Sequence, residues 1–363
     1  MKIDLHTHLL PKSWPDWATE YGYGDGRFVR AEPGEDDGKP CIRLMRGDTM
    51  FRRVWPNCYD ADAVLPDMDR FGIDLQVVST VPVMFGYWAK PGDGLEIARF
   101  LNNDLAEVVR ARPERFAALG TLPMQDATLA ARELERCIKD LGMPGVQIGS
   151  HLEPNTFVGR AHDLNLQAPE LAEFWSAAEE LGAAVFVHPW EMKGQDQMGE
   201  YWLPWLVGMP AETCRAVCCM IFGGIFEKHP KLRVCFAHAG GTFTGTIGRI
   251  EHGFNTRPDL VAKDNPINPR QYLKNGERPA RFFVDSATHE PKALRDVIDL
   301  FGAERVALGS DYPFPLGEHE PGRMIDEMNL DTPTKQCLFE GSACEFLGLT
   351  GAHPAIAATI NAS

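Results

Sequence analysis

The sequence predicts a (β/α)8 barrel, that is, a TIM-type barrel of the α/β class. Eight short apolar or β-branched runs recur along the chain, and helix-length amphipathic segments follow them. This alternation is typical of parallel strands joined by crossover helices. With 363 residues, the chain is long enough for one such barrel with insertions. We therefore expect a single barrel domain over residues 1–349 and a C-terminal tail over 350–363.

The strand candidates extend over the whole domain. They are residues 2–6, 75–80, 116–121, 145–149, 184–188, 233–238, 281–286 and 305–310. Helical segments such as 94–112 and 127–142 lie between them. The second segment ends at Gly142, and a glycine at the end of a periodic segment commonly terminates a helix.

Two segments interrupt the alternation of strands and helices. Residues 11–58 follow the first strand and are rich in glycine, proline, tryptophan and charge, whereas residues 189–207 follow the fifth strand. Both come after the C-terminal end of a strand, which is the rim where barrel enzymes build their sites. We therefore expect a small insertion after the first strand and further rim insertions, which would form pocket walls or a lid.

The composition argues against several classes of partner. The formal net charge is −15, and no run of lysine or arginine stands out, so binding to nucleic acid or to an anionic membrane surface is not expected. The apolar runs are only strand-sized, and the N-terminal stretch lacks the apolar region of a signal peptide. The nine cysteines contain no C-x-x-C pair, which suits reduced thiols. These features predict a cytoplasmic protein.

Histidines and one aspartate stand at the ends of the predicted strands. His6 and His8 end the first strand and share one face, because successive strand side chains alternate. His188 ends the fifth strand, His238 ends the sixth, and Asp311 follows the eighth. Strand ends converge on one mouth of a barrel, so these side chains should meet.

Four of these side chains predict a divalent metal site. The neutral imidazoles of His6, His8 and His188 and the carboxylate of Asp311 would be its ligands. This mixture of nitrogen and oxygen donors suits Zn2+, with Mn2+ or Fe2+ as alternatives.

The short motifs around these residues resemble the amidohydrolase superfamily. They read "DLHTH", "FVHPW", "FAHAGG" and "LGSDYPF". The resemblance implies metals at this position of a (β/α)8 barrel. Many members of the superfamily hold two metals bridged by a carbamylated lysine after the fourth strand, but here that stretch reads "GVQIGSHL" and offers no lysine. The departure argues for a single metal in each subunit.

Longer motifs resemble, within that superfamily, the 2-amino-3-carboxymuconate-6-semialdehyde decarboxylase family. They include "STVPVMFGYWAKP", "GTLPMQ", "YWLPWLVGMPAET" and "DYPFPLGE", and the resemblance spans residues 1–349. It implies a zinc-dependent carboxy-lyase that converts the semialdehyde to 2-aminomuconate semialdehyde and CO2. That reaction belongs to the kynurenine pathway of tryptophan catabolism and to related bacterial degradation of aromatic compounds.

The resemblance also implies a role for individual residues. The metal ligands fall on His6, His8, His188 and Asp311, and His238 matches the acid/base histidine. His238 and Asp311 are thus the catalytic candidates, with Asp311 also a ligand.

Four further positions match substrate-binding residues of the family. Arg52 matches an arginine that binds a substrate carboxylate, whereas its neighbour Arg53 has no match and reads as a solvated charge. Arg249 matches an arginine that reaches the active site of the neighbouring subunit, so a homodimer is implied. Trp202 and Phe314 match aromatic residues of the pocket. The stretches 31–38 and 153–162 look like local insertions, which leaves the pocket wall less defined than the metal site.

The expected chemistry uses the metal in place of an organic cofactor. No pyridoxal or thiamine site is recognisable, so the metal and the conjugation of the substrate must accept the electron pair that CO2 leaves behind. A metal-bound water and His238 would supply the hydroxide and the proton transfer. Addition of hydroxide to the substrate and direct protonation of its carbon both remain open routes.

Other functions also fit parts of this pattern. The same barrel and metal-bound water could decarboxylate a related aromatic acid, such as a resorcylate, or hydrolyse a lactone or an amide. A non-catalytic metal-binding barrel would leave His238 and the two arginines without a purpose. Release of CO2 separates the decarboxylases from the hydrolases.

Overall fold

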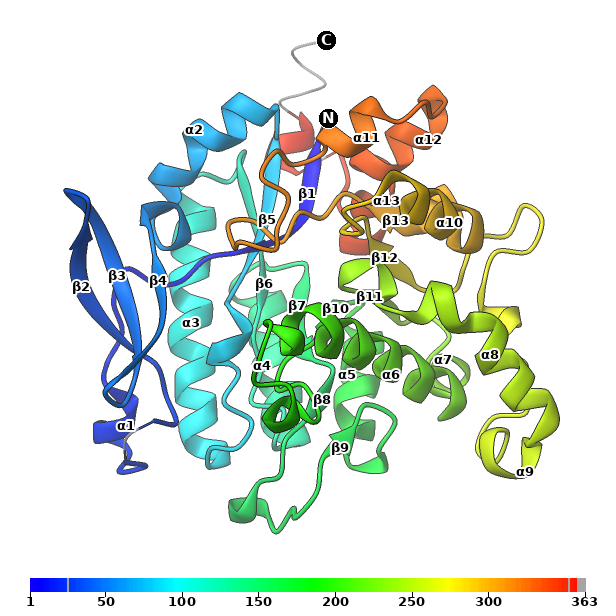
Figure 1. Ribbon diagram of the computed structural model, residues 1–363, viewed down its shortest axis with the longest axis horizontal. Helices are drawn as coiled ribbons and strands as arrows, with labels where there is room; N and C mark the ends of the chain where they lie inside the picture. Colours follow the sequence, from blue (N-terminus) through cyan, green and yellow to red (C-terminus); the bar gives the residue numbers. More distant parts are fainter. Residues whose placement is uncertain (25, 352, 358–363) are drawn as a thin grey trace.

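The computed structural model describes residues 1–24, 26–351 and 353–357 (Figure 1). Residues 352 and 358–363 of the expected tail lie outside this part of the chain. The centre of the molecule is an eight-stranded sheet in the order β1-β5-β6-β7-β10-β11-β12-β13, with parallel pairing between neighbours. Its strands follow the order of the chain, as they do in a (β/α)8 barrel.

The eight strands match the eight runs that the sequence predicts. Their bounds are β1 (Ile3–His8), β5 (Leu75–Ser79), β6 (Phe116–Gly120), β7 (Gly145–Gly149), β10 (Ala184–His188), β11 (Arg233–Phe236), β12 (Phe283–Asp285) and β13 (Val306–Ala307). The first and last strands meet through a hydrogen bond of 2.8 Å from Leu5 N to Leu308 O and a parallel bridge between Thr7 and Tyr312. The predicted barrel is therefore confirmed.

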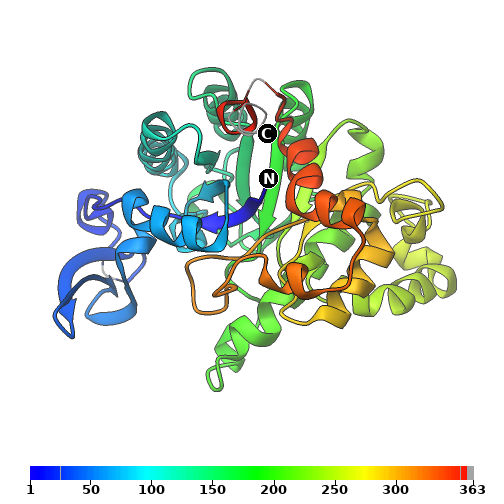
Figure 2. The ribbon, with the colours of Figure 1, turned by 90° about the horizontal axis from the view of Figure 1, so that it is seen from above.

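Helices cover the outside of the barrel (Figures 1 and 2). Their bounds are α2 (Ala61–Phe71), α3 (Pro91–Ala111), α4 (Ala127–Lys139), α5 (Ala172–Glu180), α6 (Met209–Phe222), α7 (Ile225–Lys228), α8 (Phe243–Thr256), α9 (Pro258–Val261), α10 (Pro291–Phe301), α11 (Arg323–Glu327), α12 (Thr332–Gln336) and α13 (Ser342–Leu347). Local sequence sets several of their ends. At α4, the carboxylate of Asp126 accepts a hydrogen bond from Leu129 N, and Gly142 follows the helix with a φ of 69°.

The insertion after β1 forms a small sheet beside the barrel. It contains the short helix α1 (Trp17–Glu20) and the antiparallel strands β2 (Arg30–Asp36), β3 (Lys39–Arg46) and β4 (Thr49–Val54). The sheet projects from one side of the molecule in both views (Figures 1 and 2). A second addition, the two-residue strands β8 (His151–Leu152) and β9 (Leu164–Asn165), brackets the stretch that the sequence marks as a local insertion.

The helical stretch Pro204–Phe222, which includes α6, is long and apolar enough to pass a membrane-span test of length and composition. It is the one such stretch among the described residues. Ala216, Val217, Met220 and Ile221 on this stretch are buried in the main apolar core. One apolar face of α6 therefore packs in the core, as expected of a helix that covers a barrel.

Candidate metal centre and active site

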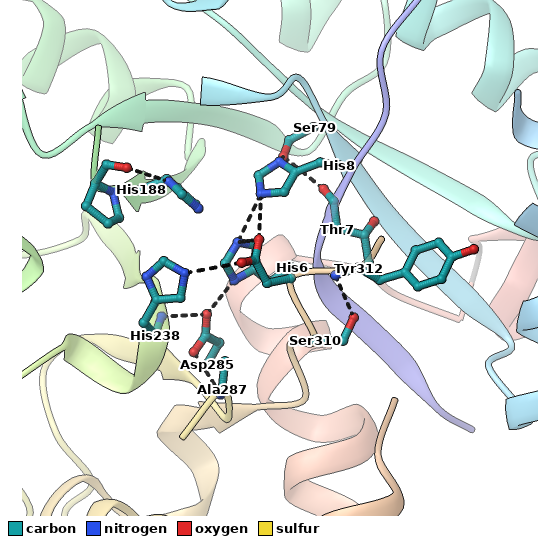
Figure 3. Close-up of polar contacts among 12 residues, drawn as sticks. His6, Thr7, His8, Ser79, His188, His238, Asp285, Ala287, Ser310 and Tyr312 are labelled. Carbon is teal, nitrogen blue, oxygen red and sulfur yellow. Dashed lines mark hydrogen bonds and ion pairs between the residues drawn. The ribbon is translucent and has the colours of Figure 1, made fainter. Parts of the chain in front are cut away.

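The barrel brings together all five side chains that the sequence places at strand ends. His6 and His8 lie on β1, His188 ends β10, and His238 and Asp311 lie in the loops after β11 and β13. Asp311 is the common neighbour: its Oδ1 lies 3.1 Å from His8 Nε2 and 3.4 Å from His6 Nε2, and its Oδ2 lies 3.7 Å from His238 Nε2. Figure 3 shows the four imidazoles around one centre.

His188 faces the same centre and has an unpaired nitrogen. Its ring centroid lies 5.0 Å from that of His6, 5.1 Å from that of His8 and 5.0 Å from that of His238. Its Nδ1 donates a hydrogen bond of 2.9 Å to Pro189 O, so the lone pair is on Nε2. Among the described residues, the buried Nε2 has no hydrogen-bond partner. A buried imidazole nitrogen without a partner is costly unless a ligand takes its lone pair.

The rings of the other two candidate ligands, His6 and His8, are oriented in the same way. His6 donates Nδ1–H to Asp285 at 2.7 Å and His8 donates Nδ1–H to Thr80 O at 3.2 Å, so both present Nε2 to the centre. The two Nε2 atoms are 3.2 Å apart. Burial lowers the pKa of His8 and of His188, which favours neutral rings. Converging neutral imidazoles beside a carboxylate are a donor set that fits a divalent metal ion.

His238 differs electrostatically from the other imidazoles. Burial disfavours its charged form, but the hydrogen bond to Asp311 and the charges of Asp311 and Asp285 outweigh burial and raise the pKa of His238. A ring that retains a proton is a poor metal ligand and a suitable proton donor. One set of four donor atoms that lie within 4.8 Å of one another nevertheless comes from His6, His188, His238 and Asp311, without His8. Geometry thus allows either His8 or His238 as the fourth ligand.

Backbone strain is concentrated at the same place. His238, Ala239 and Asp311 have φ values of 55°, 54° and 57°, in the left-handed region that favours glycine. Such residues cost about 1–3 kcal/mol each and persist where the surrounding structure holds them. The loops after β11 and β13 are therefore held in place by their surroundings rather than by local preference.

Three of the four predicted substrate-binding residues line a cavity beside this centre. Arg52, Trp202 and Phe314 line it together with His8 and Asp311. The volume of this cavity is about 40 Å³. It adjoins a larger groove of about 910 Å³, which is lined by His238 and shares Asp311 with the cavity. Burial lowers the pKa of Arg52, while the nearby Asp311 carboxylate opposes that shift. Arg52 is half-buried, and among the described residues no carboxylate forms an ion pair with its guanidinium, which is therefore suited to an anionic ligand.

Two other arginines lie outside this cavity. Arg53 forms an ion pair of 2.7 Å with Asp36 on the small sheet, as expected of a surface charge. Arg249 is exposed on α8 and lines neither the cavity nor the adjoining groove. Its predicted role requires a second subunit and is untested in a single chain.

Sequence reasoning missed several residues of the site. Asp285, at the end of β12, bonds to His6, and the rings of Phe51, Trp190 and Trp205 line the cavity. A charged residue ending an apolar strand was a usable signal for Asp285. His151, which follows the fourth barrel strand, lies elsewhere: its Nδ1 is 3.2 Å from Glu212 on α6.

Comparison with known proteins agrees with this geometry. The amidohydrolase family model matches residues 3–349. The chain is 51% identical over 351 residues to 2-amino-3-carboxymuconate-6-semialdehyde decarboxylase of Dictyostelium discoideum, covering 96% of this chain and 92% of that one. It is 38% identical to the protein of the same name from Caenorhabditis elegans, over 90% and 88% of the two chains.

A solved structure shares the fold. A dihydroxybenzoic acid decarboxylase from Polaromonas sp. JS666 with bound manganese superimposes with a TM-score of 0.75 at 24% identity, over 97% of this chain and 98% of that one. The chain therefore belongs to the amidohydrolase family and, within it, to the 2-amino-3-carboxymuconate-6-semialdehyde decarboxylases.

Proposed function

We propose that this protein is a metal-dependent carboxy-lyase that converts 2-amino-3-carboxymuconate-6-semialdehyde to 2-aminomuconate semialdehyde and CO2. One observation carries the proposal. The imidazoles and the carboxylate of the family motifs converge on one centre, beside a half-buried arginine, in a chain 51% identical to a decarboxylase of this name. The reaction places the protein in the kynurenine pathway of tryptophan catabolism.

His6, His8, His188 and Asp311 are the proposed metal ligands, and Zn2+ is the proposed ion, with Mn2+ or Fe2+ as alternatives. When bound, such an ion supplies Lewis acidity and lowers the pKa of a water molecule to about 7. Nδ1–H of each ligand histidine is held by Asp285, Thr80 O or Pro189 O, so the three Nε2 atoms need no reorientation before binding.

The remaining residues act on the substrate. Loss of CO2 breaks the bond between the carboxylate carbon and its neighbour and leaves the electron pair on that neighbour, where a proton must replace the carboxylate. His238, whose Nε2 lies 3.7 Å from Asp311 Oδ2, is the group placed to deliver that proton. Arg52 would bind a substrate carboxylate through its two terminal N–H groups. Phe51, Trp202 and Phe314 line the cavity around it and would limit the access of water to the bound substrate.

We also propose a cytoplasmic homodimer. All nine cysteines are free, which fits a reducing compartment. The substrate carries two carboxylates, and Arg52 accounts for one of them. Arg249 of the partner subunit would bind the other, consistent with its exposure on α8.

The decisive experiment is to give freshly made semialdehyde to protein loaded with Zn2+ and to follow its absorbance together with released CO2. We expect substrate loss and CO2 release in equal amounts. 2,6-Dihydroxybenzoate, a lactone and an amide serve as competing substrates. Turnover of the lactone or the amide without CO2 release would instead indicate a hydrolase, and preference for the benzoate would indicate a decarboxylase of aromatic acids.

A further inference from the structure

Asp285 is a buried carboxylate that accepts four hydrogen bonds beneath the candidate centre. Its side chain is fully buried at the end of β12. Oδ2 accepts from His6 Nδ1 at 2.7 Å and from His238 N at 2.9 Å. Oδ1 accepts from Ala239 N at 2.7 Å and from Ala287 N at 3.1 Å. Figure 3 shows Asp285 between His6, His238 and Ala287. One side chain thus contacts the ring of one candidate ligand and the backbone of the acid/base loop.

The contact with His6 selects the tautomer of that ring. An ionised carboxylate has only acceptor sites, so the His6 nitrogen that faces it must be the protonated one. The lone pair of His6 is then on Nε2, which points to His8 and Asp311. The other tautomer would place a hydrogen where a metal has to bind.

The two contacts of Asp285 with the loop after β11 act on the backbone of that loop. His238 and Ala239 are both in the left-handed region, and their N–H groups are the ones that Asp285 accepts. Hydrogen bonds from backbone N–H groups to a charged acceptor are stronger than those to a neutral one, and two of them can offset the strain of such residues. The direction of the His238 side chain follows from this backbone conformation.

We propose that Asp285 is a positioning residue that fixes the metal-binding tautomer of His6 and the location of His238 together. The part of this proposal that concerns His238 rests on the proposed function, because it is tested by turnover. The part that concerns metal binding by His6 requires no substrate. An amide cannot replace the carboxylate, because an asparagine offers one acceptor oxygen and one NH2 group. In either orientation, two of the four donors would face N–H groups and lose their partner.

The first test is the metal affinity of metal-free Asp285→Asn protein, measured for Zn2+ and Mn2+ by competition with a chelator. Loss of a carboxylate that orients a histidine ligand typically costs 10–100-fold in affinity, and we expect a loss of about that size. The matched control is Glu133→Gln. The Glu133 side chain is equally buried and accepts 2.7 Å hydrogen bonds from Asn102 and Arg136, but it lies on α4. It should bind metal within about twofold of the unchanged protein. An Asp285→Asn protein with unchanged affinity would overturn the proposal.

The second test separates the backbone role from the metal role. At saturating metal, Asp285→Asn should still lower kcat by about 10-fold or more, with KM little changed, since Arg52 does not contact Asp285. Ala239→Gly, which tolerates a φ of 54°, should restore part of kcat in the double variant but none of the metal affinity. Normal kcat in Asp285→Asn at saturating metal would overturn the His238 part of the proposal.

Two safeguards keep these tests decisive. If Asp285→Asn does not fold, metal affinity is compared between the Ala239→Gly/Asp285→Asn double variant and Ala239→Gly alone. If the unchanged protein binds metal but does not decarboxylate the semialdehyde, the proposed function fails while the metal-affinity result still decides the role of Asp285 toward His6.

Discussion

The guanidinium carbon of Arg52 lies 4.9 Å from the centroid of the Phe314 ring. Arg52 comes from β4 of the small sheet and Phe314 from the loop after β13, so this contact joins the insertion to the barrel rim. The stacked ring holds the guanidinium at the cavity without neutralising its charge.

Replacing Arg52 by alanine should weaken substrate binding more than it slows the chemical step. A charge-assisted hydrogen bond to a carboxylate contributes about 1.5–3 kcal/mol, so KM should rise roughly 10–100-fold. The neighbouring Arg53→Ala is the matched control, because Arg53 pairs with Asp36 instead. Steady-state kinetics of both variants test this, and equal KM values in the two would contradict the role given to Arg52.

Replacing His238 by alanine should lower kcat by about 100-fold or more and leave metal content close to normal, as expected for loss of an acid/base group. Kinetics and metal analysis of the same preparation distinguish this from loss of a ligand. His162→Ala, which removes an exposed histidine of the rim, should retain full activity. Loss of the metal in His238→Ala would show that His238 is a ligand and His8 is not the fourth one.

Mixing inactive Arg249→Ala and His238→Ala proteins should restore activity if Arg249 serves the partner subunit. Once subunits exchange, half of the dimers are mixed and each carries one complete site, so about a quarter of full activity is expected. Mass spectrometry of the mixture verifies exchange. Complete exchange without recovery would mean that Arg249 acts in its own subunit or not at all.

Removal of the metal should lower thermal stability as well as activity. A ligand present at about 100 times its dissociation constant stabilises the native state by about 2.7 kcal/mol. Zn2+ added to the metal-free protein should therefore raise Tm, and the rise should be largely lost in His188→Ala, because the buried Nε2 of His188 has no hydrogen-bond partner among the described residues. Differential scanning calorimetry checks this, and an equal rise in both proteins would place the metal elsewhere.

Asp104 on α3 predicts a pH dependence of stability away from the site. Burial, with the charge of Glu107, raises the pKa of Asp104 from 3.8 to about 6, while Lys12 opposes that shift. Because the folded protein binds this proton more tightly than the unfolded chain, the stabilisation is present below about pH 4 and is lost as the pH rises through about 6. Asp104→Asn should therefore raise Tm at pH 7.5 and change it much less at pH 4.5. An equal change at both pH values would contradict the shift.

The barrel could be predicted because buried parallel strands leave a simple mark in the sequence. Runs such as 184–188 are apolar throughout since both faces are covered, and a histidine at the end of such a run stands out. The small sheet could not be predicted in the same way. Its strand β2, RAEPGED, is half exposed and contains proline and glycine, so it lacks both apolar content and clear alternation.

Some residues of the candidate site could likewise be predicted from the sequence, and others could not. His6, His8, His188, His238 and Asp311 were predictable because strand ends converge in a closed barrel. The role of Asp285 was not, because it depends on backbone N–H groups, and every residue except proline carries one. The role proposed for Arg249 requires a second chain, so the structure of one subunit does not test it.

The small sheet also bears on how this protein could acquire new specificities. All four imidazoles of the candidate centre come from the barrel, whereas Arg52, the arginine proposed to bind the substrate, is carried by a segment inserted between β1 and α2. Exchanging that segment between relatives should therefore redirect the choice of acid while sparing the machinery that removes CO2, so that recognition and reactivity can evolve at different rates.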